Sequence, residues 1–138
     1  MIRTALKTAM AALVATTIGT SAFIAPAQAG GSLSVHVQPR NEQESRAMRA
    51  GLSLYSIYNQ VKGGASIRQI GSGNAAGIAQ DGRGNQGIVH QEGRGHNGTV
   101  TQNGNNNSYG LFQFGRNTNG HATQTGNGNA GATFQFGW

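Results

Sequence analysis

Seven glutamines recur at intervals of eleven residues through the second half of the chain, without one exception. They are Gln69, Gln80, Gln91, Gln102, Gln113, Gln124 and Gln135. A glycine follows two positions after each of them: Gly71, Gly82, Gly93, Gly104, Gly115, Gly126 and Gly137. A fixed period held over half a chain is typical of folds built from stacked repeats, because each short unit buries its apolar face only against its neighbours. The repeat therefore constrains the fold more strongly than any local motif.

The residues after each glutamine predict a tight turn. Four positions on, the chain carries only glycine or asparagine, the two residue types that adopt positive φ at the lowest cost. The next position is polar in every complete copy, so its side chain can bond the turn backbone. The asparagines at this position, which we expect to form a polar ladder, are Asn74, Asn85, Asn107 and Asn129.

Each turn is followed by a pattern typical of a β-strand. A small residue, an apolar residue and the next glutamine lie two positions apart, which is the spacing of side chains on one face of a strand. The apolar core positions are Ile67, Ile78, Val89, Val100 and Leu111. A single strand-turn unit cannot bury this face alone, so successive units must stack. We therefore predict an all-β fold over residues 65–138, a two-sheet β-solenoid of seven 11-residue strand-turn units with two units in each coil.

The glutamines supply interior contacts that the few apolar side chains of each coil cannot. At the cross-β spacing of about 4.8 Å, each side-chain amide can bond the identical amide above and below it. A buried glutamine without such partners would be costly. The alternative is a disordered or prion-like low-complexity segment. Random low complexity would not keep seven glutamines in phase with the alternation of small residue, apolar residue and glutamine.

The first 29 residues have the features of a secretory signal peptide. Arg3 and Lys7 precede an uncharged, largely apolar stretch over residues 11–25, and small residues end the segment at Ala27 and Ala29. The apolar stretch is too short for a membrane anchor, so we expect cleavage after Ala29 and no membrane span after cleavage. The exported chain has no cysteine to compensate for a thin core, and self-association is an available alternative.

Residues 30–64 do not follow the repeat, so they form a separate N-terminal segment. Residues 32–37 alternate polar and apolar side chains, which predicts a short strand. Asn41 with Glu44 resembles a capping box, and apolar residues at helical spacing predict one amphipathic helix over about residues 42–62. Two interpretations remain. The segment is a packing helix or a partly disordered leader, or it covers the first coil and leaves the end at residues 134–138 free to grow.

Residues suited to catalysis or metal binding do not converge in the repeats. Asp81 and Glu92 fall on opposite predicted sheets, while His90, His96 and His121 occupy three different repeat positions. We therefore expect no enzyme activity, no metal site and no cofactor.

The charge of the chain is modest once the leader is removed. The net charge is +6 for the whole chain and +4 without Arg3 and Lys7. The remaining charges are scattered, so they do not indicate specific nucleic-acid recognition. Arg94 and Arg116 recur at one turn position, where stacked like charges would either slow aggregation during export or bind surface polyanions.

Two outward patterns suggest other contacts. The first is a threonine array, formed by Thr99, Thr101, Thr123 and Thr125. It suits a monomeric secreted β-solenoid that binds surface glycans or ice, although its third row, residues 77–79, breaks the array. The second pattern is aromatic and comprises Phe112, Phe114, Phe134 and Phe136. We expect these rings to stack outside the core, either as a lateral contact surface or as simple cross-strand pairs.

Residues 69–80 match a known repeat at every specified position. Their sequence, QIGSGNAAGIAQ, fits the pattern Q-x-G-x-G-N-x-A-x3-Q of the curlin repeat. The chain resembles a curli subunit, the building block of bacterial extracellular amyloid fibres. The resemblance implies a non-enzymatic structural subunit of a surface fibre, or pilus, of a Gram-negative bacterium, with roles in biofilm formation and cell adhesion.

The same resemblance implies the partners of the chain. They are identical copies in a homopolymer, a sister curli subunit, the outer-membrane curli secretion pore and secretion chaperones. Some repeat positions depart from the family pattern, with His96 and Thr118 in place of asparagine and Tyr109 at a small position. The aromatic end at residues 135–138 resembles the major fibre subunit, whereas the basic character favours the nucleator, so both roles remain open.

Overall fold

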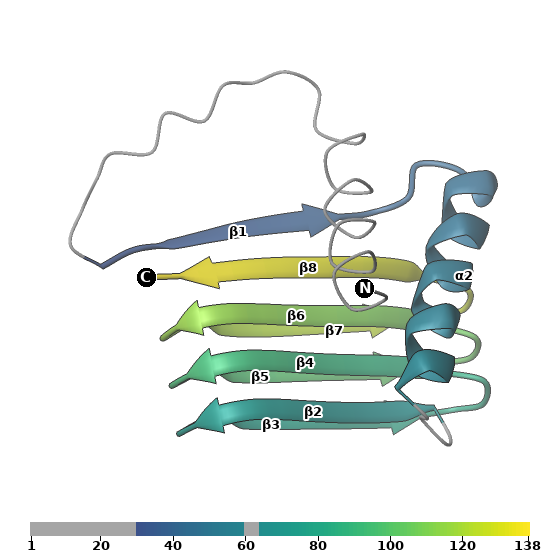
Figure 1. Cartoon of the computed structure of the whole chain (residues 1–138). Helices are drawn as coiled ribbons and strands as arrows, with labels where there is room; N and C mark the ends of the chain where they lie inside the picture. The colour runs from purple at the N-terminus through teal and green to yellow at the C-terminus, as the bar shows by residue number, and fades with distance from the viewer. Residues whose placement is uncertain (1–29, 60–63) are drawn as a thin grey trace.

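The computed structural model describes residues 30–59 and 64–138, which form two β-sheets and one helix (Figure 1). The elements are β1 (Ser32–Val37), α2 (Glu42–Tyr58), β2 (Ala65–Ser72), β3 (Ala75–Asp81), β4 (Gln86–Arg94), β5 (Asn97–Asn103), β6 (Ser108–Arg116), β7 (Asn119–Thr125) and β8 (Ala130–Gly137). The predicted signal peptide and the last three residues of the predicted helix lie outside the described residues.

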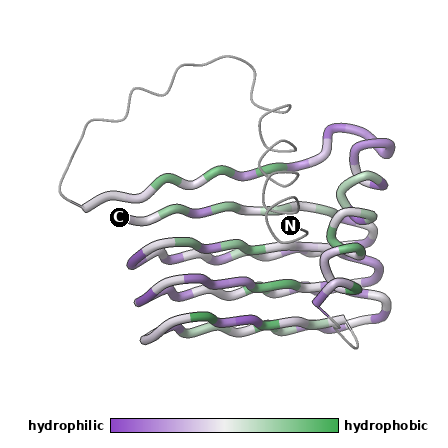
Figure 2. Tube along the Cα trace, in the orientation of Figure 1, coloured by the Kyte–Doolittle hydropathy of each residue, from purple (hydrophilic) through white to green (hydrophobic). Residues whose placement is uncertain are grey.

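Successive repeat strands alternate between the two sheets. The larger sheet has the order β1-β8-β6-β4-β2, and the smaller has the order β3-β5-β7. All neighbouring repeat strands are parallel and pair with an offset of two repeats, so that Gln91 lies between Gln69 and Gln113. This arrangement confirms the predicted two-sheet β-solenoid, preceded by one strand and one helix. Hydropathy alternates along the strands because neighbouring side chains point to opposite faces (Figure 2).

The turns have the left-handed backbone that their residues suggested. The φ angle is +123° at Gly104, the second position after its glutamine, and +58° at Asn106, the fourth. The coils also stack closely at this point, because a Cβ on Gly104 would lie 2.0 Å from the carbonyl oxygen of Gly126. Glycine is therefore required both for the backbone conformation and for the approach of the next coil.

The apolar core between the sheets is small. It consists of Val89, Val100, Leu111 and Ala122, with Ile78 half-buried against them. Contrary to expectation, Ile67 is not buried, and 47% of its surface is exposed. The reason is its place on β2, the outermost repeat strand of its sheet, where it is covered from one side only.

Helix α2 covers the outer face of the larger sheet (Figure 1). It begins after Asn41, whose side-chain oxygen accepts a hydrogen bond of 2.8 Å from the Glu44 backbone N–H. Its apolar residues Leu52 and Tyr55 pack in one buried cluster with Phe112 and Phe134. A second apolar layer therefore lies outside the solenoid.

This second layer corrects the prediction for the aromatic residues. Phe112 and Phe134 are stacked at 4.9 Å between ring centroids, but they are buried beneath α2 and are not available as a contact surface. Phe114 and Phe136 also stack, at 5.4 Å, and are more exposed. The alternative of cross-strand stacking is therefore confirmed for both pairs. The alternative of a contact surface was wrong for Phe112 and Phe134, because nothing in the repeat period indicates where the helix packs.

Strand β1 lies at the end of the solenoid opposite to the one expected. It pairs antiparallel with β8, from Ser32 opposite Gly137 to Val37 opposite Ala132. The N-terminal segment therefore covers the β8 edge and leaves the β2 and β3 edges without a strand partner among the described residues. Of the two interpretations of this segment, the one that leaves residues 134–138 open was wrong, since a strand of alternating polar and apolar residues can pair with either end.

Candidate assembly edges and the glutamine ladder

The predicted glutamines form two continuous ladders inside the solenoid. In the larger sheet, Nε2 of Gln69 donates to Oε1 of Gln91 at 2.8 Å, Gln91 donates to Gln113 at 2.8 Å, and Gln113 donates to Gln135 at 2.7 Å. In the smaller sheet, Gln80 donates to Gln102 at 2.7 Å and Gln102 donates to Gln124 at 2.8 Å. The strand register that places like residues together therefore places their amides in hydrogen-bonding contact.

The same amides also join the two sheets. Gln91 Nε2 donates to the carbonyl of Ala75 at 2.8 Å, and Gln102 Nε2 donates to the carbonyl of Gln86 at 3.0 Å. From Gln80 to Gln135, every repeat glutamine makes such a bond to a carbonyl sixteen residues earlier. Gln91, Gln102 and Gln113 have no exposed surface. Their burial is tolerable because each amide has partners on both sides.

The ladders have a direction. Each Nε2 donates toward the strand that follows by two repeats, so donors point to the β7 and β8 end and acceptors to the β2 and β3 end. Among the described residues, Oε1 of Gln69 and Oε1 of Gln80 accept no hydrogen bond. At the other end, Gln135 Nε2 donates to Oγ of Ser34 on β1 at 3.1 Å. The two ends of the solenoid are therefore chemically complementary.

A polar ladder also follows each column of turns. Oδ1 of Asn85 accepts from the Asn107 backbone N–H at 3.0 Å, and Oδ1 of Asn107 accepts from the Asn129 backbone N–H at 3.0 Å. Asn74 lies in the other column, where it accepts from the His96 backbone N–H at 3.1 Å. His96 and Thr118 replace asparagine there and bond each other at 2.7 Å between Nδ1 and Oγ1. The two replacements thus keep this column hydrogen-bonded.

Six of the seven repeat glycines occupy turns with positive φ. They are Gly71, Gly82, Gly93, Gly104, Gly115 and Gly126. Gly137 is the last residue of β8.

Residues 64–93 match the family model of the curlin associated repeat. The chain therefore contains the curlin repeat. The matched segment covers β2, β3 and most of β4, and the structure repeats the same unit through residue 137. No curated protein and no solved structure matches the chain significantly.

The repeat and the β-solenoid fit a structural subunit of the curli type. The curlin-repeat family is structural and non-enzymatic. Within residues 30–59 and 64–138, no group of three or more His, Cys, Asp or Glu side chains is placed to hold a metal ion. In the same ranges, no helix is both long enough and apolar enough to cross a membrane.

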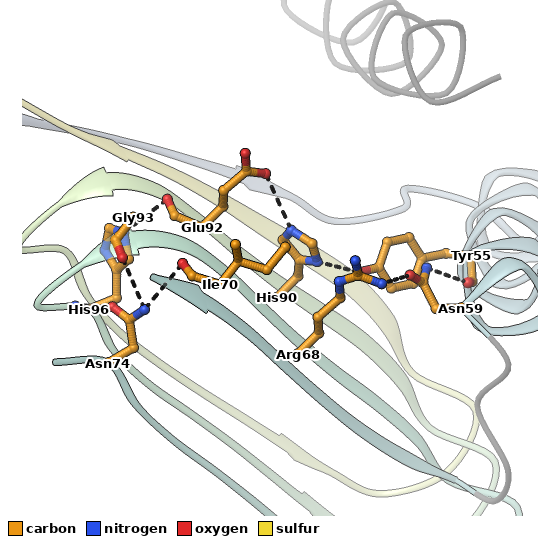
Figure 3. Close-up of polar contacts among 9 residues, drawn as sticks. All are labelled: Tyr55, Asn59, Arg68, Ile70, Asn74, His90, Glu92, Gly93 and His96. Carbon is orange, nitrogen blue, oxygen red and sulfur yellow. Dashed lines mark hydrogen bonds and ion pairs between the residues drawn. The ribbon is translucent and has the colours of Figure 1, made fainter. Parts of the chain in front are cut away.

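The curlin-repeat protein has one polar cluster that the repeat pattern did not reveal (Figure 3). The Tyr55 hydroxyl on α2 is hydrogen-bonded to Nδ1 of His90 on β4, and Nε2 of His90 lies 3.8 Å from a carboxylate oxygen of Glu92. Arg68 on β2 donates to Oδ1 of Asn59 at 2.8 Å. Burial raises the pKa of Tyr55 to about 12, against the opposing influence of Arg68 and with a smaller contribution from Glu92. The cluster fixes the C-terminal half of α2 on the sheet.

The side chains that face outward on successive coils of the curlin-repeat protein are less regular than those that face inward. Arg94 and Arg116 are direct neighbours in register, and both are exposed. The threonine array is interrupted by His121, which bonds Oγ1 of Thr99 at 2.7 Å and Oγ1 of Thr123 at 3.1 Å. The hydroxyls of Thr99 and Thr123 are thus hydrogen-bonded to His121 within the protein.

Ser34 is the ladder residue that sequence reasoning missed. It lies opposite Gln135 and receives the hydrogen bond that another glutamine would otherwise accept. The only available signal was the alternation of residues 32–37, in which Ser34 and His36 share a face. His36 lies on the same face of β1 as Ser34, and its Nδ1 is hydrogen-bonded to Oγ1 of Thr133 at 2.8 Å.

Proposed function

We propose that this curlin-repeat protein is a structural subunit of extracellular curli-like amyloid fibres and that it assembles by templated β-strand addition. The glutamine ladder carries the proposal, because its unused acceptors lie at one end of the solenoid and its donors point to the other. A second copy can continue both the ladder and the backbone hydrogen bonds of the sheets. The fibre would serve biofilm formation and cell adhesion.

The proposed location is a surface fibre of a Gram-negative bacterium. The signal peptide expected over residues 1–29 supports export, followed by a non-repeat segment over residues 30–64 and the assembling solenoid over residues 65–138. The proposed partners are identical copies, a sister curli subunit, the outer-membrane curli secretion pore and its chaperones. The exposed pair Arg94 and Arg116 is the proposed contact for surface polyanions.

Assembly of purified residues 30–138 tests the function. We expect thioflavin fluorescence to rise after a lag and preformed fibres to shorten that lag. Fibre diffraction should give reflections at about 4.8 Å and about 10 Å. A persistent soluble monomer without a cross-β pattern contradicts the proposal and favours a monomeric solenoid that binds glycans or ice.

A further inference from the structure

The two sheets of the solenoid contain unequal numbers of repeat strands. Seven repeat units place β2, β4, β6 and β8 in one sheet but only β3, β5 and β7 in the other. A cleft runs along the unpaired side of β7, lined by the five consecutive residues 121–125 and by Gln38 and Tyr109. The smaller sheet therefore lacks one strand at the end where the larger sheet carries β8.

We propose that the next copy of this chain docks after a half-turn about the long axis of the solenoid. Its β2 then pairs with β7, and its β3 pairs with β8 in the place now held by β1. This inference rests on the proposed assembly into fibres and specifies the geometry of the junction. Without the half-turn, β2 of the incoming copy would lie on β8 and its β3 would lie above β7. The smaller sheet would then have a gap of about 9.6 Å, twice the spacing of paired strands.

The glutamine side chains support this junction. Gln124 on β7 donates to the carbonyl of Ser108 at 3.2 Å, but it lacks the second donation, to another glutamine, that Gln102 makes. In the proposed junction Oε1 of the incoming Gln69 accepts that hydrogen bond. Oε1 of the incoming Gln80 likewise replaces Ser34 as the acceptor for Gln135. Both ladders then continue in the same direction without a missing member.

The apolar positions agree with the same register. Alignment of the incoming Gln69 with Gln124 places Ile67 above Ala122, which extends the column formed by Ile78, Val100 and Ala122. Ile67 is 47% exposed in the single copy. Its burial at the junction would contribute roughly 1 kcal/mol. Ile67 lies at the β2 end of the solenoid, and the cleft along β7 lies at the opposite end. The half-turn therefore places Ile67 of the incoming copy against the cleft of the copy that receives it.

The length of α2 also favours the half-turn. The helix runs across the strands from the level of β1 to that of β2 (Figure 1), and its 17 residues span about 26 Å. Copies stacked without rotation would repeat on the same face every four strand spacings, or about 19 Å, so their helices would collide. With the half-turn, helices on one face are about 34 Å apart. This spacing exceeds the length of about 26 Å of one helix, so the helices of successive copies do not overlap.

The junction requires β1 to leave β8. Two backbone hydrogen bonds join Gly31 and Trp138, at 3.1 and 3.0 Å, and these bonds extend the antiparallel pairing, which begins at Ala132, to Trp138. β1 therefore acts as a removable cover on the edge to which the next copy adds.

Engineered cysteine pairs in the otherwise cysteine-free chain test this geometry. Neighbouring residues of paired parallel strands lie about 4.8 Å apart, a distance that a disulfide can bridge. The proposed junction brings Ile70 next to Thr125 and Asp81 next to Phe136, whereas unrotated stacking brings Ile70 next to Phe136. The variants are therefore I70C/T125C, I70C/F136C and D81C/F136C. Fibres of each are oxidised, dissolved in denaturant without reductant and separated by size, with the single-cysteine variants as controls.

We expect I70C/T125C and D81C/F136C to form ladders of covalent oligomers, while I70C/F136C remains monomeric. A ladder from I70C/F136C and none from I70C/T125C overturns the half-turn but leaves fibre formation intact. A ladder from I70C/T125C alone overturns the displacement of β1. If neither the unmodified chain nor any variant forms fibres, both this inference and the proposed function fail.

Discussion

Gln113 occupies the centre of the longer glutamine ladder and contacts both sheets. Its Nε2 donates to Gln135 at 2.7 Å and to the carbonyl of Asn97 at 2.9 Å, while its Oε1 accepts from Gln91 at 2.8 Å. Tyr109, an exception to the small residue of the repeat, does not interrupt the ladder there. At the residue scale, stability therefore depends on amides that bond one another along the ladder and also donate to backbone carbonyls of the facing sheet.

Substitution Gln113→Ala should lower the free energy of unfolding by about 2 to 5 kcal/mol, because it leaves buried donors and acceptors without partners. Gln69→Ala is the matched control, since Gln69 is exposed and donates only one ladder bond. We expect the control to lose less than about 1 kcal/mol. Urea unfolding of freshly purified monomer measures both values. Equal losses would contradict the role assigned to the buried ladder.

The turn glycines lead to a second prediction at this scale. Gly104→Ala should cost about 3 kcal/mol, from left-handed strain and from the contact with the Gly126 carbonyl. Gly77→Ala is the control, because a Cβ there lies an ordinary 3.8 Å from the Thr99 side chain. The control should change stability by no more than about 0.5 kcal/mol. Thermal unfolding of the two variants compares them directly, and a stable Gly104→Ala would refute the close-stacking argument.

At the element scale, α2 is attached by a mixture of apolar and polar contacts. Met48 and Leu52 pack on the aromatic pair of the sheet, whereas Tyr55 combines ring contacts with a hydrogen bond to His90. The centroid of the Tyr55 ring lies 5.4 Å from the centroid of the Phe112 ring, and the two rings are arranged edge to face. Ionisation of Tyr55 would place a charge in this buried site, so docking of the helix should depend on pH.

The pKa of Tyr55 is raised from its ordinary value of 10.0 to about 12 by burial. The folded state therefore favours the protonated hydroxyl, and this stabilisation is complete below about pH 10 and is lost as the pH rises toward 12. We expect protection of the α2 amides from hydrogen exchange to fall in that interval while the β5 amides remain protected. Tyr55→Phe should remove this component of the pH dependence. An unchanged profile in the variant would assign the effect to another group.

At the scale of the whole molecule, an N-terminal strand closes an edge that a polymer must use. β1 and β8 are joined across 101 residues of sequence at Ser34 and Gln135. The antiparallel strand ends the ladder with a serine, whereas a repeat strand would continue it with glutamine. The single copy is thus covered at one end and open at the other, which favours growth only after β1 has moved.

A disulfide between β1 and β8 should prevent that movement. L33C/F136C joins two directly opposite residues on the outer face, at about 5.5 Å between Cα atoms for a hydrogen-bonded pair. We expect the oxidised variant to assemble at least about tenfold more slowly than the same variant after reduction, corresponding to 1.4 kcal/mol or more in the barrier. Thioflavin kinetics with and without reductant provide the comparison. Equal rates would mean that β1 does not control assembly.

Local spacing was sufficient to predict much of the fold. The eleven-residue period predicted the alternation of strands between two sheets, and the residue pattern within each period predicted the turns and the inward face. Asn106 illustrates why, since a positive φ is needed at its turn position and the sequence offers only glycine or asparagine there. Asn41 and Glu44 likewise predicted the start of the helix from contacts three residues apart.

The sequence by itself determined that the chain stacks, in which register, and which side chains face inward, because a strict repeat encodes these properties locally. Only the tertiary structure decided which end is covered and which aromatic rings are buried. Residues 32–37 and the apolar face of α2 carry no period that matches the solenoid, so their positions depend on contacts between distant segments. The physical reason is that the repeat places identical hydrogen-bonding residues at fixed intervals, which specifies which repeat strands pair with each other. The position of a single strand or helix outside the repeat depends instead on the surface that the folded repeats present to it.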